Sequence, residues 1–336
     1  MKHLLLLAVM LTQLFAAQNL DKVTLQLQWY HQFQFAGYYM AKEKGFYAEA
    51  GLDVDINEVN VSTDIVTDVL QREGRYATGR TSLIVERTNG KKVVALAAIL
   101  QASPIVIVTK ERPDIQRVED LVGKHVDSLG STIDSVVMRG LLNARNITVE
   151  RPYHDHMTSG IDSLIHDHAD DIVVYNTSEI YQLKARGIKS RVFHPRGYAF
   201  DFYSDILFSS ESEVQNHPER AAAFRLASLQ GWEYAFAHID ETIELILNKY
   251  NTQQKSREAL TYEANVLRKL AYYQTDKIGK IGRDKILEFY DTYQNLPQVE
   301  DGFDVDAFLF EDEGNKRFIL KNEEKAYLKT KKEITL

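Results

Sequence analysis

The stretch LQLQWYHQFQFAGYYMAKEKGFYAEAGLDVDI, residues 25–56, decides the fold. Apolar and polar side chains alternate from Val23 to Trp29, the period of two that is typical of a half-buried strand. A helix is predicted from about Phe35 to Gly45, and a second short helix ends at Gly51, a glycine suited to a left-handed cap. Leu52 to Ile56 alternate again and predict a second strand. Strands separated by helices indicate an α/β domain.

The same pattern continues up to residue 108. Ser62 is the expected N-cap of a helix that ends near Gly74 and carries Ile65, Val66, Val69 and Leu70 on one face. Two apolar runs then predict strands at Val93–Leu100 and Pro104–Val108. The alternation of strands and helices favours a largely parallel sheet.

A second block of strands and helices begins after Pro113. Val126 opens a strand, GSTIDSVVMRGLLNARNI (residues 130–147) predicts a turn and a helix, and a further helix covers about Gly160 to His168. Residues 171–176, DIVVYN, predict a short strand.

The third block starts with the strand-like run Asp205–Ser210 and continues as helices, with Pro218 in the first turn of one and Asp240 as the cap of the next. Two α/β blocks with a return to the first predict two lobes joined by two crossings, near Val106–Thr109 and Tyr203–Phe208. A ligand usually binds in the cleft between such lobes. The predicted parts are residues 1–17 as a leader, 18–108 plus 206–310 as lobe 1, 109–205 as lobe 2, and 311–336 as a tail.

The N-terminus has the pattern of a secretory signal peptide. A basic start, Met1-Lys2-His3, precedes the apolar run Leu4–Ala17, which is shorter than the roughly 20 residues that span a bilayer. We expect cleavage near Ala16 or Ala17, and export to the periplasm; an uncleaved anchor is the alternative.

Composition excludes several classes of function. The 336 residues are 44% hydrophobic and 26% charged, as in globular proteins, and a net charge of -8 does not favour binding to nucleic acid or an anionic membrane. No apolar segment after the leader is long enough to span a membrane. The absence of cysteine excludes thiolate catalysis, cysteine-bound metals and a lipoprotein anchor. We expect no cofactor.

Several stretches in order carry a family resemblance: the segment quoted above, VVALAAILQASPIVIV, DLVGKHV, VYNTSE, FYSDILFSS, HPERAAAFRLASLQGWEYAFAHIDETIELILNKYN and LTYEANVL. From about residue 22 to 295 the chain resembles the periplasmic substrate-binding proteins that share a fold with thiamine-pyrimidine synthases. Sulfonate-, nitrate- and taurine-binding proteins are more distant members. The resemblance implies a two-lobed type II periplasmic binding fold that closes on a small ligand.

A thiamine-precursor pyrimidine, or a similar flat polar heterocycle, is the ligand that this resemblance implies. Members serve either as the receptor of an ABC importer or as the extracytoplasmic sensor of a signalling protein such as a histidine kinase or diguanylate cyclase. The tail NEEKAYLKTKKEITL resembles the segment that follows the sensor modules. An ABC permease or a signalling module is therefore the expected protein partner.

An enzymatic role is disfavoured. The synthases have a lysine and a histidine shortly after a glycine equivalent to Gly79, plus a cysteine-rich loop. Here the two positions are Thr81 and Val85, and threonine cannot hold pyridoxal phosphate as a Schiff base. Thr81, Gln101 and Ser103 occupy positions of the family's motifs and are kept as candidate ligand residues.

The aromatic residues of the quoted stretch are candidates for the ligand site. Trp29 lies at a strand end, where ligands of α/β sheets gather, or else packs under the next helix. His31 can donate to a ring nitrogen or carboxylate, or be merely exposed. Tyr38 and Tyr39 point about 100° apart, so one of them is expected in the core and Tyr38 is favoured for the ligand.

Five further candidates lie in or beside the second block. Ser131 and Thr132 precede a predicted helix and can offer hydroxyl and backbone N–H groups, or act as an ordinary cap. Tyr175 and Glu179 follow a strand, and a carboxylate there suits the amino group of a pyrimidine. Asp201 can do the same or form a salt bridge.

Two histidine pairs, His154 with His156 and His166 with His168, invite a metal-binding interpretation. On a helix a spacing of two residues separates side chains by about 200°, so His166 and His168 cannot clasp one ion. No metal site is predicted.

Overall fold

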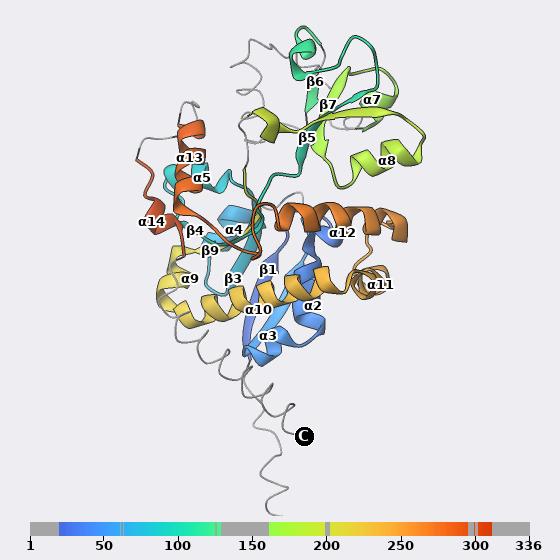
Figure 1. The fold of residues 1–336 in the computed structure, drawn as a ribbon. Helices are drawn as coiled ribbons and strands as arrows, with labels where there is room; N and C mark the ends of the chain where they lie inside the picture. The colour runs from blue at the N-terminus through green and yellow to red at the C-terminus, as the bar shows by residue number, and fades with distance from the viewer. Residues whose placement is uncertain are drawn as a thin grey trace, which may run out of the picture.

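Two separate sheets organise the part of the chain that the computed structural model describes, residues 20–60, 62, 64–124, 126–128, 161–198, 202–294, 299 and 302–310 (Figure 1). The first sheet has five strands in the order β2-β1-β3-β9-β4. Its strands are β1 (Asp21–Gln26), β2 (Leu52–Asn57), β3 (Arg75–Gly79), β4 (Val93–Leu100) and β9 (Ser204–Ser210).

The second sheet is smaller and has the order β6-β7-β5-β8. Leu164 and Leu183, from two short helices, pack with Val106, Ile172 and Val174 in its core. The elements are β5 (Ile105–Lys110), β6 (Val126–Ser128), β7 (Asp171–Tyr175), β8 (Ser190–Phe193), α7 (Ile161–Ile165), α8 (Glu179–Ala185), and the 3-10 turns η2 (Val118–Leu121) and η3 (Pro195–Tyr198).

Both sheets are mixed, so the prediction of a largely parallel sheet is wrong. β1 runs parallel to β2 and β3, but β9 is antiparallel to both β3 and β4. In the second sheet β6 and β7 are parallel, whereas β5 is antiparallel to β7 and β8. The first strand that the chain forms after each crossing, β5 in the second sheet and β9 in the first, therefore runs opposite to its neighbours.

Helices cover both faces of the first sheet. Consecutive residues of β3 point to opposite faces: Tyr76 packs with one group of helices and Ala77 with the other. On the Tyr76 face lie η1 (Phe33–Phe35), α2 (Ala36–Glu43), α3 (Phe46–Glu49), α10 (Pro218–Ala237), α11 (Ile239–Lys249) and α12 (Arg257–Ala271). The remaining helices are α4 (Ile65–Leu70), α5 (Leu83–Thr88), α9 (Glu211–Asn216), α13 (Arg283–Tyr293) and α14 (Val305–Phe308).

The chain passes between the sheets earlier than the sequence predicts. It leaves β4 at Leu100 and enters β5 at Ile105, and it returns between η3 and β9. The predicted boundary at residue 108 falls inside β5, because that strand pairs continuously with β7 and β8. The predicted leader, residues 1–17, and the predicted tail, 311–336, lie outside the described residues.

Two predicted caps are also wrong. Asp64, not Ser62, caps α4: its Oδ1 accepts hydrogen bonds from the backbone N–H groups of Val66 and Thr67. α11 begins at Ile239, so Asp240 lies within its first turn and His238 is the N-cap residue. Pro218 does begin α10, and Gly51 has the predicted left-handed conformation, with φ of +82°.

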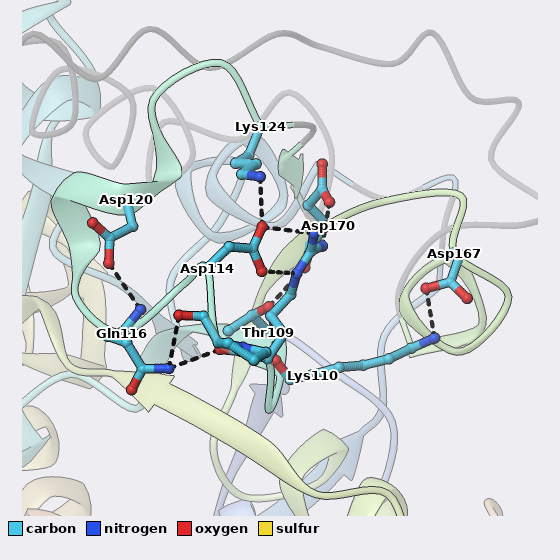
Figure 2. A network of polar contacts seen from close by, with 10 residues as sticks. Thr109, Lys110, Asp114, Gln116, Asp120, Lys124, Asp167 and Asp170 are labelled. Carbon is cyan, nitrogen blue, oxygen red and sulfur yellow. Dashed lines mark hydrogen bonds and ion pairs between the residues drawn. The ribbon is translucent and has the colours of Figure 1, made fainter.

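A network of ion pairs closes one end of the second sheet (Figure 2). Arg112, just after β5, donates to Asp114 and to Asp170, which precedes β7. Hydrogen bonds from Arg112 and then Lys124 hold the pKa of Asp114 well below its usual range. Lys110 donates to Asp167 in the same way. The network fastens the C-terminal end of β5 to the N-terminal end of β7.

Among the described helices, none is long and apolar enough to cross a membrane.

Candidate functional site

A cavity of about 360 Å³ lies where the two sheets face each other. On the second sheet it meets the end opposite the ion-pair network, because Ile105 begins β5 and Tyr175 ends β7. On the first sheet it lies just beyond β1. Its lining residues are Gln28, Trp29, Gln32, Gln34, Arg80 and Gln253 from the first lobe, and Ile105, Val173, Tyr175, Thr177, Ser178, Glu179 and Gln182 from the second.

Trp29 lies at the mouth of the cavity with 46% of its surface exposed. Tyr30 contacts it edge to face, with ring centroids 5.6 Å apart. An exposed indole beside a cavity offers a flat apolar face on which a ring can stack. The other tryptophan, Trp232, is fully buried in the core.

Tyr175 and Arg80 connect the two lobes across the cavity. Arg80, which follows β3, donates from Nε to the Tyr175 hydroxyl at 2.6 Å, and its guanidinium lies 5.4 Å from the centre of the tyrosine ring. The pair therefore forms a polar part of the cavity wall to which each lobe contributes one side chain.

Glu179 begins α8 and carries the only strongly shifted carboxyl group among the lining residues described. No described residue donates to its buried Oε2. Burial raises its pKa to about 7, while Lys255 nearby acts in the opposite direction. The group can therefore accept a hydrogen bond as a carboxylate or donate one as an acid.

Asp205 lies behind the cavity wall, in β9. It is 2% exposed, and its Oδ1 accepts hydrogen bonds from Gln28 Nε2 at 2.5 Å and Gln34 Nε2 at 2.6 Å. Burial raises its pKa to about 6, against the opposing effect of these bonds and of Arg80. Two cavity side chains are thus held in place by one buried carboxylate.

Of the residues proposed from sequence, Trp29, Tyr175 and Glu179 come together around the cavity. His31 does not line it: its Nδ1 lies 2.9 Å from the Tyr39 hydroxyl, and burial lowers its pKa. Tyr38 is fully buried edge to face with Trp232, so both Tyr38 and Tyr39 are core residues.

The three positions taken from the family motifs also lie outside the cavity wall. The Thr81 hydroxyl donates to the backbone oxygen of Tyr203. Gln101 donates from Nε2 to the backbone oxygens of Ala98, in β4, and Lys280, after α12, and Ser103 accepts from the N–H of Ile105. These contacts support the first crossing and the end of the second, where the chain enters β9. Ser131, Thr132 and Asp201 lie outside the described residues.

Sequence reasoning missed the five glutamines, which make up half of the polar residues in the lining. Gln28 occupies the polar side of the alternation at the end of the first strand, next to Trp29. Gln32 and Gln34 sit between the aromatic residues that follow. Glutamine belongs to no binding motif that a sequence search can recognise. The one signal in the sequence was that these glutamines follow the carboxyl end of a central strand, where ligands of α/β sheets bind.

The comparisons with known proteins agree with this architecture. A formylaminopyrimidine-binding protein of Halalkalibacterium halodurans is 27% identical over 68% of this chain and 71% of its own. A riboflavin-binding protein of Chloroflexus aurantiacus is 27% identical over 69% and 67%. The aliphatic sulphonate binding protein of Escherichia coli has a similar structure, with a TM-score of 0.61, 12% identity, and coverage of 86% and 97%.

The last likeness shows the fold, which is the two-lobed fold of periplasmic binding proteins, as the sequence predicts. Residues 32–242, well over half of the chain, match the family described as NMT1/THI5 like. They include β2, β3, β4 and β9 of the first sheet and the described part of the second sheet. All seven residues that line the second lobe's side of the cavity lie within the match, as do three of the six on the first lobe's side, Gln32, Gln34 and Arg80. The chain therefore belongs to the NMT1/THI5-like family.

Proposed function

We propose that this protein is an extracytoplasmic solute-binding protein that closes on a small polar heterocycle, a thiamine-precursor pyrimidine, for uptake by an ABC importer. The observation that carries the proposal is the cavity between the lobes, which combines aromatic faces with neutral amides and a buried carboxyl group. Its volume of about 360 Å³ is near the lower end for ligand pockets, which suits a ring of this size.

The chemistry of the lining favours an aminopyrimidine. Trp29 and Tyr175 supply surfaces for a flat ring, and Glu179 supplies a hydrogen-bonding partner for an exocyclic amino group and its neighbouring ring nitrogen. A sulfonate would instead meet a carboxyl group, which repels an anion when ionised. The relative that binds formylaminopyrimidine supports the same ligand class.

Binding, rather than synthesis, fits the residues at the positions of the synthase motif. Thr81 uses its hydroxyl to bond the backbone of Tyr203 and has no amine for a Schiff base. Two relatives at 27% identity are named as binding proteins. An ABC permease that recognises the closed form is the proposed partner, and the apolar N-terminal run is the proposed export signal.

A ligand panel tests the proposal directly. The purified protein is titrated by calorimetry with formylaminopyrimidine, an aminopyrimidine alcohol, riboflavin, an aliphatic sulfonate and nitrate. We expect the aminopyrimidines to bind, and to stabilise the protein by about 2.7 kcal/mol at a concentration of 100 times Kd. Binding of the sulfonate alone, or of riboflavin alone, would show that the ligand class is different.

Glu179→Gln tests the role of the carboxyl group in the same assay. A glutamine amide offers one acceptor and one donor group, whereas the ionised carboxylate offers two acceptors, one for the amino group and one for a protonated ring nitrogen, so we expect about tenfold weaker aminopyrimidine binding. The matched control is Glu219→Gln, in the exposed first turn of α10 and away from the cavity, which should bind as the original protein does.

A further inference from the structure

A directional chain of hydrogen bonds runs through the first-lobe wall of the cavity. Lys255 Nζ donates to Gln32 Oε1 at 2.5 Å, Gln32 Nε2 donates to Gln34 Oε1 at 2.5 Å, and Gln34 Nε2 donates to Asp205 Oδ1 at 2.6 Å. Gln28 reaches the same carboxylate oxygen from the other side, with its Nε2 at 2.5 Å. Three of these five residues line the cavity.

The chemistry of its two ends fixes the direction of the chain. An ammonium group only donates hydrogen bonds and an ionised carboxylate only accepts them. The amide oxygen of Gln32 must therefore face Lys255, and each later amide must present its oxygen backward and its nitrogen toward Asp205. Above its pKa of about 6, Asp205 is ionised and the arrangement has a single orientation.

The lysine end of the chain is anchored as firmly as the carboxylate end. Lys255 forms an ion pair at 3.0 Å with Glu263, which is 1% exposed. The other oxygen of Glu263 accepts from the backbone N–H of Gln34 at 2.9 Å. Both terminal charges are thus held by buried partners, so the amides between them are not free to rotate.

Gln28 connects the fixed hydrogen-bond chain to the cavity, because it is bonded to Asp205 and also lines the cavity. Its Nε2 is bound to Asp205, and no described residue donates to its Oε1. One N–H of Nε2 is engaged by Asp205, and the carbonyl oxygen is the hydrogen-bond acceptor that Gln28 offers to the cavity it lines. Asp205 has a φ of +50°, a left-handed backbone that is uncommon for residues other than glycine and that aspartate adopts more readily than most.

We propose that Asp205 is a positioning residue that sets the ligand preference of the cavity: by holding the Gln28 amide it presents a fixed hydrogen-bond acceptor, which selects ligands carrying an N–H donor. This inference rests on the proposed function, because it specifies which heterocycles that same site accepts. A heterocycle with an oxygen acceptor at the corresponding place faces the Gln28 oxygen with no hydrogen between them and is rejected.

The test measures preference rather than affinity alone. Calorimetry gives the ratio of the dissociation constants of an aminopyrimidine and its methoxy analogue, which lacks the N–H donor. Asp205→Asn removes the charge that orders the chain, and we expect the preference for the amino compound to fall about tenfold. Gln28→Met should cause the same loss. In the double variant the loss should remain about tenfold, because both changes remove one interaction.

Two outcomes would overturn the inference: an unchanged preference in Asp205→Asn, or losses that multiply in the double variant as for independent sites. The control is Glu213→Gln, a second buried carboxylate in the same lobe, which accepts from Tyr76 and Arg220 and has no contact with the cavity lining. That substitution should lower the melting temperature and leave the preference unchanged.

A measurement without ligand separates this inference from the proposed function. If no pyrimidine binds the unaltered protein, the proposed function fails. The chain of hydrogen bonds from Lys255 to Asp205 is then tested separately, by NMR measurement of hydrogen exchange at the glutamine side-chain NH₂ protons. Slow exchange at Gln34 that becomes fast in Asp205→Asn supports the ordered chain. Equal exchange in both proteins contradicts it, whatever the ligand is.

Discussion

Glu179 couples the cavity to pH through one carboxyl group. Its pKa is about 7 in the folded protein, above its ordinary value of 4.5. The folded state therefore holds this proton more tightly, and the resulting stability is full below pH 4.5 and is lost as the pH rises through 7. Glu179→Gln has no proton to lose. Relative to the original protein, its free energy of unfolding should rise by about 2–3 kcal/mol between pH 4.5 and 8.

Urea unfolding at several pH values, without ligand, measures this difference. Asp171 and Asp205 also have raised pKa values, but they are common to both proteins and cancel in the comparison. Glu219→Gln, in the exposed first turn of α10, is the control for the loss of a carboxyl group as such. A constant offset between Glu179→Gln and the original protein would show that Glu179 is not buried as described.

At the residue scale, the sequence showed which kinds of side chain lie near the cavity better than it showed which of them face the cavity and which face the core. The aromatic stretch placed Trp29 at the end of the first strand, where the cavity lies. The same stretch could not show that Tyr38 and Tyr39 are both buried, because α10, α11 and α12 come nearly 200 residues later and cover them. Asp205 was visible only as the start of a strand, since its bonds to Gln28 and Gln34 are likewise long-range.

Among the helices, α2 and α10 approach each other more closely than side chains would allow, at Gly37 and Gly231. A Cβ atom at Gly231 would lie 2.1 Å from the backbone oxygen of Gly37 and 2.7 Å from the backbone nitrogen of Ala41. Alanine favours a helix by about 1 kcal/mol over glycine. The clash with backbone outweighs that gain, so Gly231→Ala should destabilise the protein by about 1–3 kcal/mol.

Urea unfolding of Gly231→Ala measures this cost. Gly197 provides the control: no atom lies within 4 Å of the position of its Cβ, so Gly197→Ala should change stability by less than about 0.5 kcal/mol. If Gly231→Ala were as stable as the original protein, α2 and α10 would have to lie farther apart than described.

The patterns of single elements were read more successfully than their ends. β4 has the predicted bounds Val93–Leu100 because eight consecutive buried residues mark it. The cap of α4 was misassigned because Ser62 and Asp64 both suit an N-cap, and only the bonds to Val66 and Thr67 distinguish them. β3 was missed because its residues, Arg75–Gly79, include no large aliphatic side chain.

At the scale of the whole molecule, the two-lobed architecture followed from block order, but strand direction did not. β9 is buried along its whole length, so its sequence shows no alternation that could fix its neighbours or direction. Its place between β3 and β4 depends on pairings formed across more than 100 residues. The predicted first crossing lies too late in the chain because the apolar run of β5 continues on both sides of the predicted boundary at residue 108. Nothing in that run marks the point at which the chain leaves the first lobe.

Closure of the two lobes should be visible through one tryptophan. The chain has two, Trp29, which is 46% exposed at the cavity mouth, and Trp232, which is fully buried. Ligand that draws the lobes together should shield Trp29, shift its fluorescence to shorter wavelength and reduce its quenching by acrylamide. In Trp29→Phe the tryptophan fluorescence comes from Trp232 alone, and its emission should not change when ligand is added. If calorimetry shows saturation while quenching of Trp29 is unchanged, the ligand binds without covering the mouth of the cavity, and closure is not the mechanism.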